Sequence, residues 1–311
     1  MGNCKEFDPT GISNYYSNKV RDVISGLKKK PAIVAFFANP DEGKIRIAES
    51  IKRACLKTGI SFELSQVSKY DLEEEVLKAN EDEAITGIII NYPVFGNRQD
   101  EYLKNVILPE KDVEGLCHRT RYNIFHNIRT TSNGHKPILP CTPLAIMKTL
   151  KHLGAYDKRL EKGNRLYGKA IVVINRSERV GRPLAALLAN DGACVHSVDI
   201  SDIQAMSRGP GLKFPKFKLI SARMSFEECL NNADIIISGV PSKSYKIHQK
   251  LIKEGAICIN FSSDENFDAS IKLRASVFVK SLGELERVML MRNSLRSAIQ
   301  QSNFPPLTHS K

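Results

Sequence analysis

The sequence predicts an α/β protein of two domains, the second of which has the Rossmann-type order of a dinucleotide-binding unit. Short apolar runs alternate with helical patterns along most of the chain, which indicates a mostly parallel sheet covered by helices. In addition, an apolar run at residues 170–174 ends in a polar turn that leads directly into a helical segment. The length of 311 residues fits two domains of moderate size.

The N-terminal half alternates between the two periodicities. Helices are predicted over residues 12–27, 44–58 and 71–79, and strands over residues 31–37, 62–67 and 87–92. Gly59 closes the second helix, since glycine readily takes the left-handed conformation of a helix C-terminus. Pro93 ends the last strand, because proline cannot donate a hydrogen bond to a sheet.

The C-terminal half begins with a connector at Pro140. Thr142 suits the N-cap and Pro143 the first position of a helix over residues 144–153, which Gly154 ends. Strands are predicted over residues 170–174, 193–199, 234–238, 256–260 and 275–279, and helices from Pro183 and over residues 284–299. Residues 207–219 are rich in Lys, Pro and Gly and are predicted to form an exposed loop.

The turn after residues 170–174 is the predicted dinucleotide site. Of the glycine pattern G-x-G-x-x-G only Gly181 is present, and Asn175 stands where the first glycine is expected. The next strand ends in Asp199, near the spacing at which an acid binds the adenosine ribose. A carboxylate there accepts hydrogen bonds from a 2′-hydroxyl and repels a 2′-phosphate, so NAD is favoured over NADP. The alternative is an ordinary strand–loop–helix unit.

Bulk properties exclude several classes of protein. No apolar run approaches the roughly 20 residues of a membrane span, and the N-terminus has no apolar signal core. Gly2 and Cys4 suggest lipidation, but Glu6 replaces the Ser or Thr of a myristoylation site. The seven cysteines are scattered singly, without zinc-site spacing, which predicts no metal site and a reduced, cytoplasmic protein.

The formal net charge of +12 favours anionic partners. The densest basic stretches are residues 28–30 and 208–218. No aromatic-interleaved basic motif or nucleic-acid module is recognisable, so no nucleic-acid partner is expected. A small polyanionic ligand and a solvated basic face account for the charge equally well.

Several colinear segments carry a family resemblance. They are Asn91-Tyr92-Pro93-Val94-Phe95-Gly96-Asn97, Pro109-Glu110-Lys111-Asp112-Val113-Glu114-Gly115-Leu116, Ile138-Leu139-Pro140-Cys141-Thr142-Pro143-Leu144, residues 163–168 through 190–199, Gly239-Val240-Pro241-Ser242 and residues 254–261. Together these segments resemble the methylenetetrahydrofolate dehydrogenases, and within them the monofunctional, NAD-dependent eukaryotic branch. The resemblance implies a folate-binding catalytic domain at residues 1–142, a Rossmann-type NAD-binding domain at residues 143–283, and a cleft between them. The segment 284–311 is expected to pack back on the first domain.

The implied reaction belongs to one-carbon metabolism. A hydride passes from the methylene carbon of 5,10-methylenetetrahydrofolate to the nicotinamide ring of NAD, and 5,10-methenyltetrahydrofolate is the product. The product is a cation, so a nearby carboxylate would stabilise the developing charge. Such enzymes are often dimers, and a homodimer is expected by analogy.

The resemblance implies substrate-side roles for a few residues. Glu114 matches the acid that contacts the pterin, where many relatives carry Asp; the alternative is a charge on a surface loop. Cys141 matches a cysteine of the turn that lines the cleft, with a structural thiol at a domain hinge as the alternative. Asn91, followed by Tyr92 and Pro93, occupies the place where bifunctional members carry Gln.

On the cofactor side, the resemblance assigns Arg176 and Ser177 to the turn that binds the pyrophosphate. Gly181 belongs to the same turn. Asp199 and Ile200 match the ribose end. The loop beside the nicotinamide is expected to comprise Gly239, Val240, Pro241 and Ser242.

Two segments depart from the family pattern. Bifunctional members carry a Tyr and a Lys for the cyclohydrolase step, and the equivalent positions here are Ile47 and Ile51. An isoleucine can neither donate a proton nor polarise a water, so no cyclohydrolase activity is expected. Residues 280–288 replace a Pro- and Gly-rich loop with what reads as a helix start, in which Glu284 and Glu286 are favourably placed.

Three functional hypotheses follow from these departures. The first is a working NAD-dependent methylenetetrahydrofolate dehydrogenase. The second is a catalytically inactive NAD-binding relative with a regulatory or interaction role. The third is an oxidoreductase that acts on another substrate.

Overall fold

The computed structural model describes residues 4–38, 41–132, 134–222 and 224–302. Its described residues fall into two units. One, here called the eight-stranded unit, comprises those within Met1–Ile12, Asn123–Arg129 and Thr142–Glu286. The other, the three-stranded unit, comprises those within Ser13–Tyr122, Thr130–Cys141 and Arg287–Lys311.

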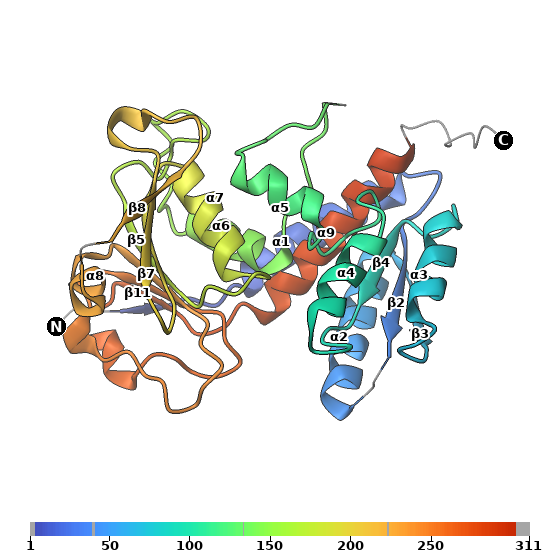
Figure 1. Ribbon diagram of the computed structural model, residues 1–311, viewed down its shortest axis with the longest axis horizontal. Helices are drawn as coiled ribbons and strands as arrows, with labels where there is room; N and C mark the ends of the chain where they lie inside the picture. The colour runs from blue at the N-terminus through green and yellow to red at the C-terminus, as the bar shows by residue number, and fades with distance from the viewer. Residues whose placement is uncertain (1–3, 39–40, 133, 223, 303–311) are drawn as a thin grey trace. The chain divides into compact units, whose positions relative to one another are not determined.

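The three-stranded unit is a parallel sheet of order β3-β2-β4, with helices around it (Figure 1). Its strands are β2 (Ala32–Phe37), β3 (Ser61–Gln66) and β4 (Gly87–Ile90); its helices are α2 (Glu42–Thr58), α3 (Leu72–Glu81), α4 (Arg98–Val106), α5 (His118–Phe125, which ends in the other unit), most of α1 (Thr10–Ser25) and the second part of α9 (Gly283–Ser302). Side chains alternate across a strand, so β2 contributes to two cores. Ile33, Ala35 and Phe37 pack in one core, and Val34 and Phe36 in the other.

The eight-stranded unit has the strand order β1-β11-β10-β9-β5-β6-β7-β8. Its strands are β1 (Lys5–Glu6), β5 (Ala170–Ile174), β6 (Cys194–Val198), β7 (Ile203–Ser207), β8 (Lys218–Ser221), β9 (Ile235–Ser238), β10 (Ile257–Asn260) and β11 (Val277–Val279); its helices include α6 (Cys141–His152, whose first residue belongs to the other unit), α7 (Gly181–Asn190) and α8 (Phe226–Asn232), and short 3₁₀ turns lie at Pro210–Leu212, Gln249–Leu251 and Ala269–Leu273. In this order the first six strands, β1-β11-β10-β9-β5-β6, pair in parallel. The pairs β6–β7 and β7–β8 are antiparallel. Alternate residues of β5 again enter two cores, with Ile171 and Val173 in one and Val172 and Ile174 in the other.

This architecture confirms the predicted α/β class with a Rossmann-like domain. The predicted α9 start is also confirmed, because the helix begins at Gly283 and carries Glu284 and Glu286 in its first turn. The domain limits 1–142, 143–283 and 284–311 stay a prediction.

Some local predictions were wrong. The predicted N-cap Thr142 lies inside the first turn of α6, which begins at Cys141. Likewise Pro183 does not open α7 but follows Gly181 by two positions. A proline is tolerated at either place, because the first N–H groups of a helix have no partner within it. Residues 218–219 belong to β8 and not to the predicted loop, since β8 pairs with β7.

Two absences hold for the part of the chain that the structure describes. No helix there is long and apolar enough to cross a membrane. No cluster of three or more His, Cys, Asp or Glu side chains there could hold a metal ion. Gly2 lies outside the described residues.

Candidate functional site

The turn that follows β5 is built by Asn175. Its backbone takes a φ of 101°, and its Oδ1 accepts a hydrogen bond from the Ser177 N–H at 2.8 Å. The start of α7 packs directly on this turn: a Cβ at Gly181 would lie 1.7 Å from the carbonyl oxygen of Asn175. The Ser177 hydroxyl accepts from the Gly181 N–H at 3.3 Å. Only glycine can therefore occupy position 181.

The same turn lies at the point where the chain reverses the direction in which it adds strands to the sheet. β5 pairs with β6 on one side and with β9 on the other. In open parallel sheets, ligands bind outside the carboxyl ends of the strands at such a switch point. Asn175 Nδ2 donates to the carbonyl oxygen of Gly239 at 2.5 Å, and the Gly239 N–H donates to Ile174 at 3.1 Å. A Cβ at Gly239 would lie 2.0 Å from the ring of Phe261, so a larger residue at this position would require the ring to move.

The predicted ribose end follows β6. Asp199 and Ile200 are both exposed, and Ile200 is 104% exposed. Asp199 Oδ1 accepts a hydrogen bond from the Ile200 N–H at 2.9 Å. The carboxylate thus lies at the carboxyl end of the strand next to β5, where the predicted hydrogen bond with a ribose hydroxyl requires it.

Arg176 makes contacts within the protein that the sequence did not indicate. Its side chain is buried and donates to the Ser197 carbonyl oxygen at 2.6 Å, to the Asp202 carbonyl oxygen at 3.0 Å and to the Asp202 carboxylate. The hydrogen bond from the Arg176 guanidinium holds the pKa of Asp202 below its usual range. These contacts fasten the loop that begins at Asp199. A direct contact of Arg176 with phosphate stays a prediction.

The predicted nicotinamide-side loop is held by Asn266, which the sequence did not single out. Asn266 is fully buried. Its Oδ1 accepts from the Val240 N–H at 2.7 Å and from the Ser238 hydroxyl at 2.9 Å, while its Nδ2 donates to the Val240 carbonyl oxygen at 2.8 Å. Pro241 is exposed, and the Ser242 hydroxyl lies 3.0 Å from that of Ser244. The loop is therefore fixed at its base.

In the three-stranded unit, Asn91, Tyr92 and Pro93 follow β4 and begin a turn held by Asp100. Asp100 is buried, and its carboxylate accepts three backbone hydrogen bonds of 3.2, 2.9 and 3.0 Å, from the N–H groups of Val94, Phe95 and Gly96. The amide nitrogen Nδ2 of Asn91 is buried and has no hydrogen-bond partner among the described residues. An amide left in this state favours a polar ligand at this turn.

The segments that carry Glu114 and Cys141 lie side by side. Gly115 has a φ of 71°, and a Cβ there would lie 2.8 Å from the backbone of Leu139 and Pro140. The Cys141 thiol lies 3.8 Å from the Val113 carbonyl oxygen. Glu114 itself is half-buried. The structure thus brings together the two predicted catalytic residues on neighbouring backbone.

The loop that contains Glu114 is fixed by the buried carboxylate of Asp112. Asp112 accepts hydrogen bonds from the N–H groups of Gly115 at 2.9 Å and Cys117 at 2.7 Å. Burial raises the pKa of Asp112, although these backbone hydrogen bonds act in the opposite direction. The residue therefore has a structural role and does not add a second acid to the site.

The positions equivalent to the cyclohydrolase Tyr and Lys lie on α2. Ile47 is 55% exposed and Ile51 is 9% exposed. Neither side chain can exchange a proton. Lys44, in the first turn of the same helix, donates to the Pro93 carbonyl oxygen at 3.3 Å, which places a cation beside the predicted substrate turn.

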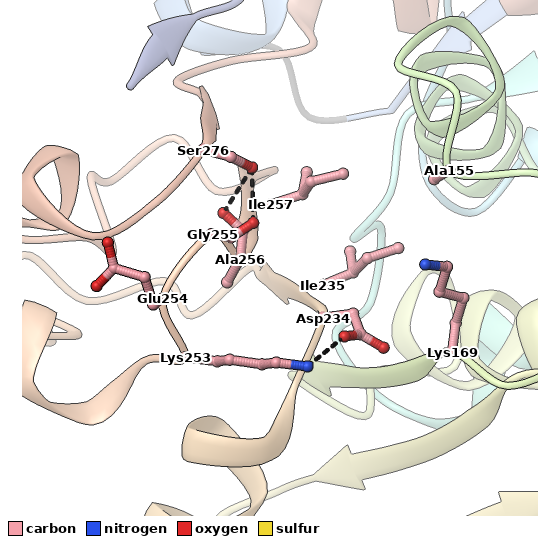
Figure 2. A pocket seen from close by; sticks show the side chains of 10 residues that line it. All are labelled: Ala155, Lys169, Asp234, Ile235, Lys253, Glu254, Gly255, Ala256, Ile257 and Ser276. Atoms are coloured by element: carbon pink, nitrogen blue, oxygen red, sulfur yellow. Dashed lines mark hydrogen bonds and ion pairs between the residues drawn. The ribbon is translucent and has the colours of Figure 1, made fainter. Parts of the chain in front are cut away.

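A cavity of about 180 Å³ lies elsewhere in the eight-stranded unit (Figure 2). It is lined by residues just before or at the start of β5, β9 and β10, among them Lys169, Asp234 and Ala256. Lys253 and Asp234 form an ion pair of 2.7 Å at its edge. These are the amino ends of the strands, opposite to the turn at Asn175, so this cavity is not the predicted dinucleotide site.

Comparison with known proteins gives consistent matches. A family model for the catalytic domain of tetrahydrofolate dehydrogenase/cyclohydrolase matches residues 7–114, and a model for the NAD(P)-binding domain of the same family matches residues 140–208. A methylenetetrahydrofolate dehydrogenase (NAD(+)) of Schizosaccharomyces pombe is 44% identical over 305 residues, which cover 97% of this chain and 95% of that protein. One from Saccharomyces cerevisiae is 46% identical and covers 86% and 85%.

Solved structures agree with the sequence matches. The NAD-dependent 5,10-methylenetetrahydrofolate dehydrogenase from Saccharomyces cerevisiae has a TM-score of 0.89 at 41% identity, with 96% of this chain and 98% of that chain covered. A methylenetetrahydrofolate dehydrogenase-cyclohydrolase from Trypanosoma brucei has a TM-score of 0.77 at 19% identity, with 98% and 100% covered. The second likeness concerns the fold alone.

Proposed function

Because the chain belongs to the tetrahydrofolate dehydrogenase/cyclohydrolase family, we propose that it is an NAD-dependent 5,10-methylenetetrahydrofolate dehydrogenase. The family membership confirms the resemblance seen in the sequence. The observation that supports the proposal most strongly is the identity of 41–46% to NAD-dependent dehydrogenases, together with an exposed carboxylate at the end of β6.

The residues of the eight-stranded unit suit a dinucleotide. The close approach of Gly181 to Asn175 leaves room for a pyrophosphate beside the α7 N-terminus, where the positive end of the helix dipole favours an anion. Asp199 accepts hydrogen bonds from the ribose and disfavours a 2′-phosphate. When bound, NAD supplies the acceptor of the hydride.

The residues of the three-stranded unit bind and orient the folate. Asn91 offers an amide donor at the Pro93 turn, since its Nδ2 has no hydrogen-bond partner among the described residues. The Glu114 carboxylate stabilises the positive charge that develops on the folate as the hydride leaves. Cys141 lies beside the Glu114 segment and contributes to the shape of the site. A fixed geometry of this kind can lower a barrier by several kcal/mol, up to roughly 7–11 in ideal systems.

Cyclohydrolase activity is absent from the proposed function. The family carries out that step with a Tyr and a Lys, and Ile47 and Ile51 occupy the corresponding positions here. The test is an assay of 5,10-methenyltetrahydrofolate hydrolysis, in which the loss of absorbance of this compound is measured. The expected rate equals that without enzyme, and an enzyme-dependent rate would contradict the assignment.

Measurements of NAD binding and of NADH formation together distinguish the proposed dehydrogenase from an inactive NAD-binding relative and from an oxidoreductase with another substrate. Calorimetric titration with NAD and a turnover assay with methylenetetrahydrofolate are run on the same preparation. The proposal expects both binding and NADH formation. Binding of NAD without turnover would favour the inactive relative or the oxidoreductase with another substrate.

The assembly and compartment are part of the same proposal. We propose a homodimer, supported by the exposed Leu219 and Ile220 on the edge strand β8, which are 60% and 53% exposed. Sedimentation equilibrium tests this, and a monomer at micromolar concentration would contradict it.

A cytoplasmic location is proposed from the scattered cysteines of the sequence.

A further inference from the structure

Asn293, on α9, joins the two segments that carry the proposed catalytic residues. Its Nδ2 donates to the Val113 carbonyl oxygen at 3.0 Å and to the Leu139 carbonyl oxygen at 2.8 Å. The same nitrogen lies 3.6 Å from the Cys141 sulfur. The two carbonyl groups belong to the residue before Glu114 and to the residue two positions before Cys141.

The side chain of Asn293 is fully buried, with 0% exposure. Asparagine is a poor residue for the buried interior of a helix, because its amide must find partners there. Both N–H bonds of this amide are used between the two segments, while Oδ1 has no hydrogen-bond partner among the described residues. An apolar side chain at this position would leave the carbonyl oxygens of Val113 and Leu139 without these hydrogen bonds.

Contacts other than those of Asn293 also hold the Glu114 segment. Gly115 already brings the Glu114 segment to within van der Waals contact of Leu139 and Pro140. One and two turns further along α9, Ser297 and Gln301 donate to the Glu110 carbonyl oxygen, Gln301 at 3.0 Å. These contacts fix Glu110, four positions before Glu114. Asn293 fixes Val113, which directly precedes Glu114.

We propose that Asn293 is a positioning residue for the dehydrogenase reaction, which holds Glu114 and Cys141 in one arrangement. The inference rests on the proposed function. Asn293 does not touch the reacting atoms; its amide sets the place of the Glu114 carboxylate relative to the folate. A displacement of about 1 Å at such a group costs about 10²-fold in rate.

The test is a double-mutant cycle of Asn293→Leu with Glu114→Gln. Leucine has a similar size but donates no hydrogen bond. In the otherwise wild-type protein, Asn293→Leu is expected to lower kcat by about 10–100-fold with the Kd for NAD unchanged. In the Glu114→Gln background, the further loss is expected to be less than about threefold, because Asn293 acts through Glu114. Equal losses in the two backgrounds, or an unchanged kcat, would overturn the inference.

The matched control is Ser294→Ala. Ser294 is equally buried, and its hydroxyl donates to Leu290 in the same helix at 2.9 Å. This variant is expected to keep the wild-type kcat. If Asn293→Leu does not fold, Asn293→Ser, which keeps one hydrogen-bond donor, takes its place in the cycle. The same non-additive loss of kcat is expected. An unchanged kcat would count against the inference.

The failure of this inference differs from failure of the proposed function. A wild-type protein that binds NAD but forms no NADH contradicts the function, and the inference with it. An active wild-type protein whose Asn293 variants keep full kcat contradicts the inference alone.

Discussion

Asn175 donates from its side-chain amide to the carbonyl oxygen of Gly239, and this hydrogen bond joins the residues that directly follow β5 and β9. The two strands are neighbours at the switch point of the sheet. One side chain therefore ties the predicted pyrophosphate turn to the predicted nicotinamide-side loop. In this chain, an asparagine with a φ of 101° occupies the place of a first glycine and adds a contact that glycine could not make.

Gly181→Ala should disrupt the dinucleotide turn. The added Cβ would lie 1.7 Å from the Asn175 carbonyl oxygen, so turn and helix must separate. We expect a loss of about 1–3 kcal/mol or more in the free energy of unfolding, measured by denaturant titration, and a weaker Kd for NAD. Gly11→Ala is the control, because no atom lies within 4 Å of its Cβ position on α1. That change is expected to alter the free energy of unfolding by less than about 1 kcal/mol.

Asp199→Ser should relax the discrimination against NADP. The carboxylate is exposed at the end of β6, where it would face a 2′-phosphate with like charge. Removal of that repulsion is expected to raise kcat/KM for NADP by about tenfold or more relative to that for NAD. Steady-state kinetics with both cofactors measure the ratio. An unchanged ratio would mean that Asp199 does not face the ribose.

Glu114→Gln should lower kcat by about 10²-fold, because the amide does not stabilise the developing positive charge. The Kd for NAD is expected to stay at the wild-type value, since the cofactor residues lie in the other unit. Stopped-flow measurement of hydride transfer and calorimetric titration check the two parts. A variant with full activity would remove Glu114 from the mechanism.

Acid should destabilise the protein through His196 on β6. Burial lowers the pKa of this imidazole below its usual value of about 6.5. As the pH falls below that value, the unfolded chain takes up a proton before the folded protein does, and stability is lost down to the folded pKa. His196→Gln should therefore give a smaller decrease in Tm between about pH 7 and about pH 5 than the wild type. The same decrease in both proteins would contradict the assignment.

The sequence predicted the elements with strong periodicity or clear end signals. Gly59 does end α2, in the left-handed conformation with a φ of 81°, and the apolar strands of both sheets lie within about two residues of their predicted limits. The strands β1, β7 and β8 could not be predicted. Lys5–Glu6 and Lys218–Ser221 have no strand pattern of their own and become strands only by pairing with β11 and β7.

The residues of the candidate site likewise fall into those that the sequence could predict and those that it could not. Asn175, Gly181, Asp199 and Glu114 stand in motifs along the chain, so their types and spacing indicate their chemistry. Asn293, Asn266 and Asp100 support the site from distant or unremarkable positions, and only the fold brings them to it. Asn293 had one signal in the sequence: it is a polar amide within the apolar pattern of a long helix. The hydrogen bonds from the Arg176 guanidinium to the backbone oxygens of Asp202 and Ser197 had no signal in the sequence either, since only the fold brings these groups together.

The most direct test is the rate of NADH formation by the purified protein with 5,10-methylenetetrahydrofolate and NAD, with NADP measured in parallel. The proposed function predicts saturable turnover with NAD and little or none with NADP. Folded protein that binds NAD but forms no NADH, or that prefers NADP, would contradict it.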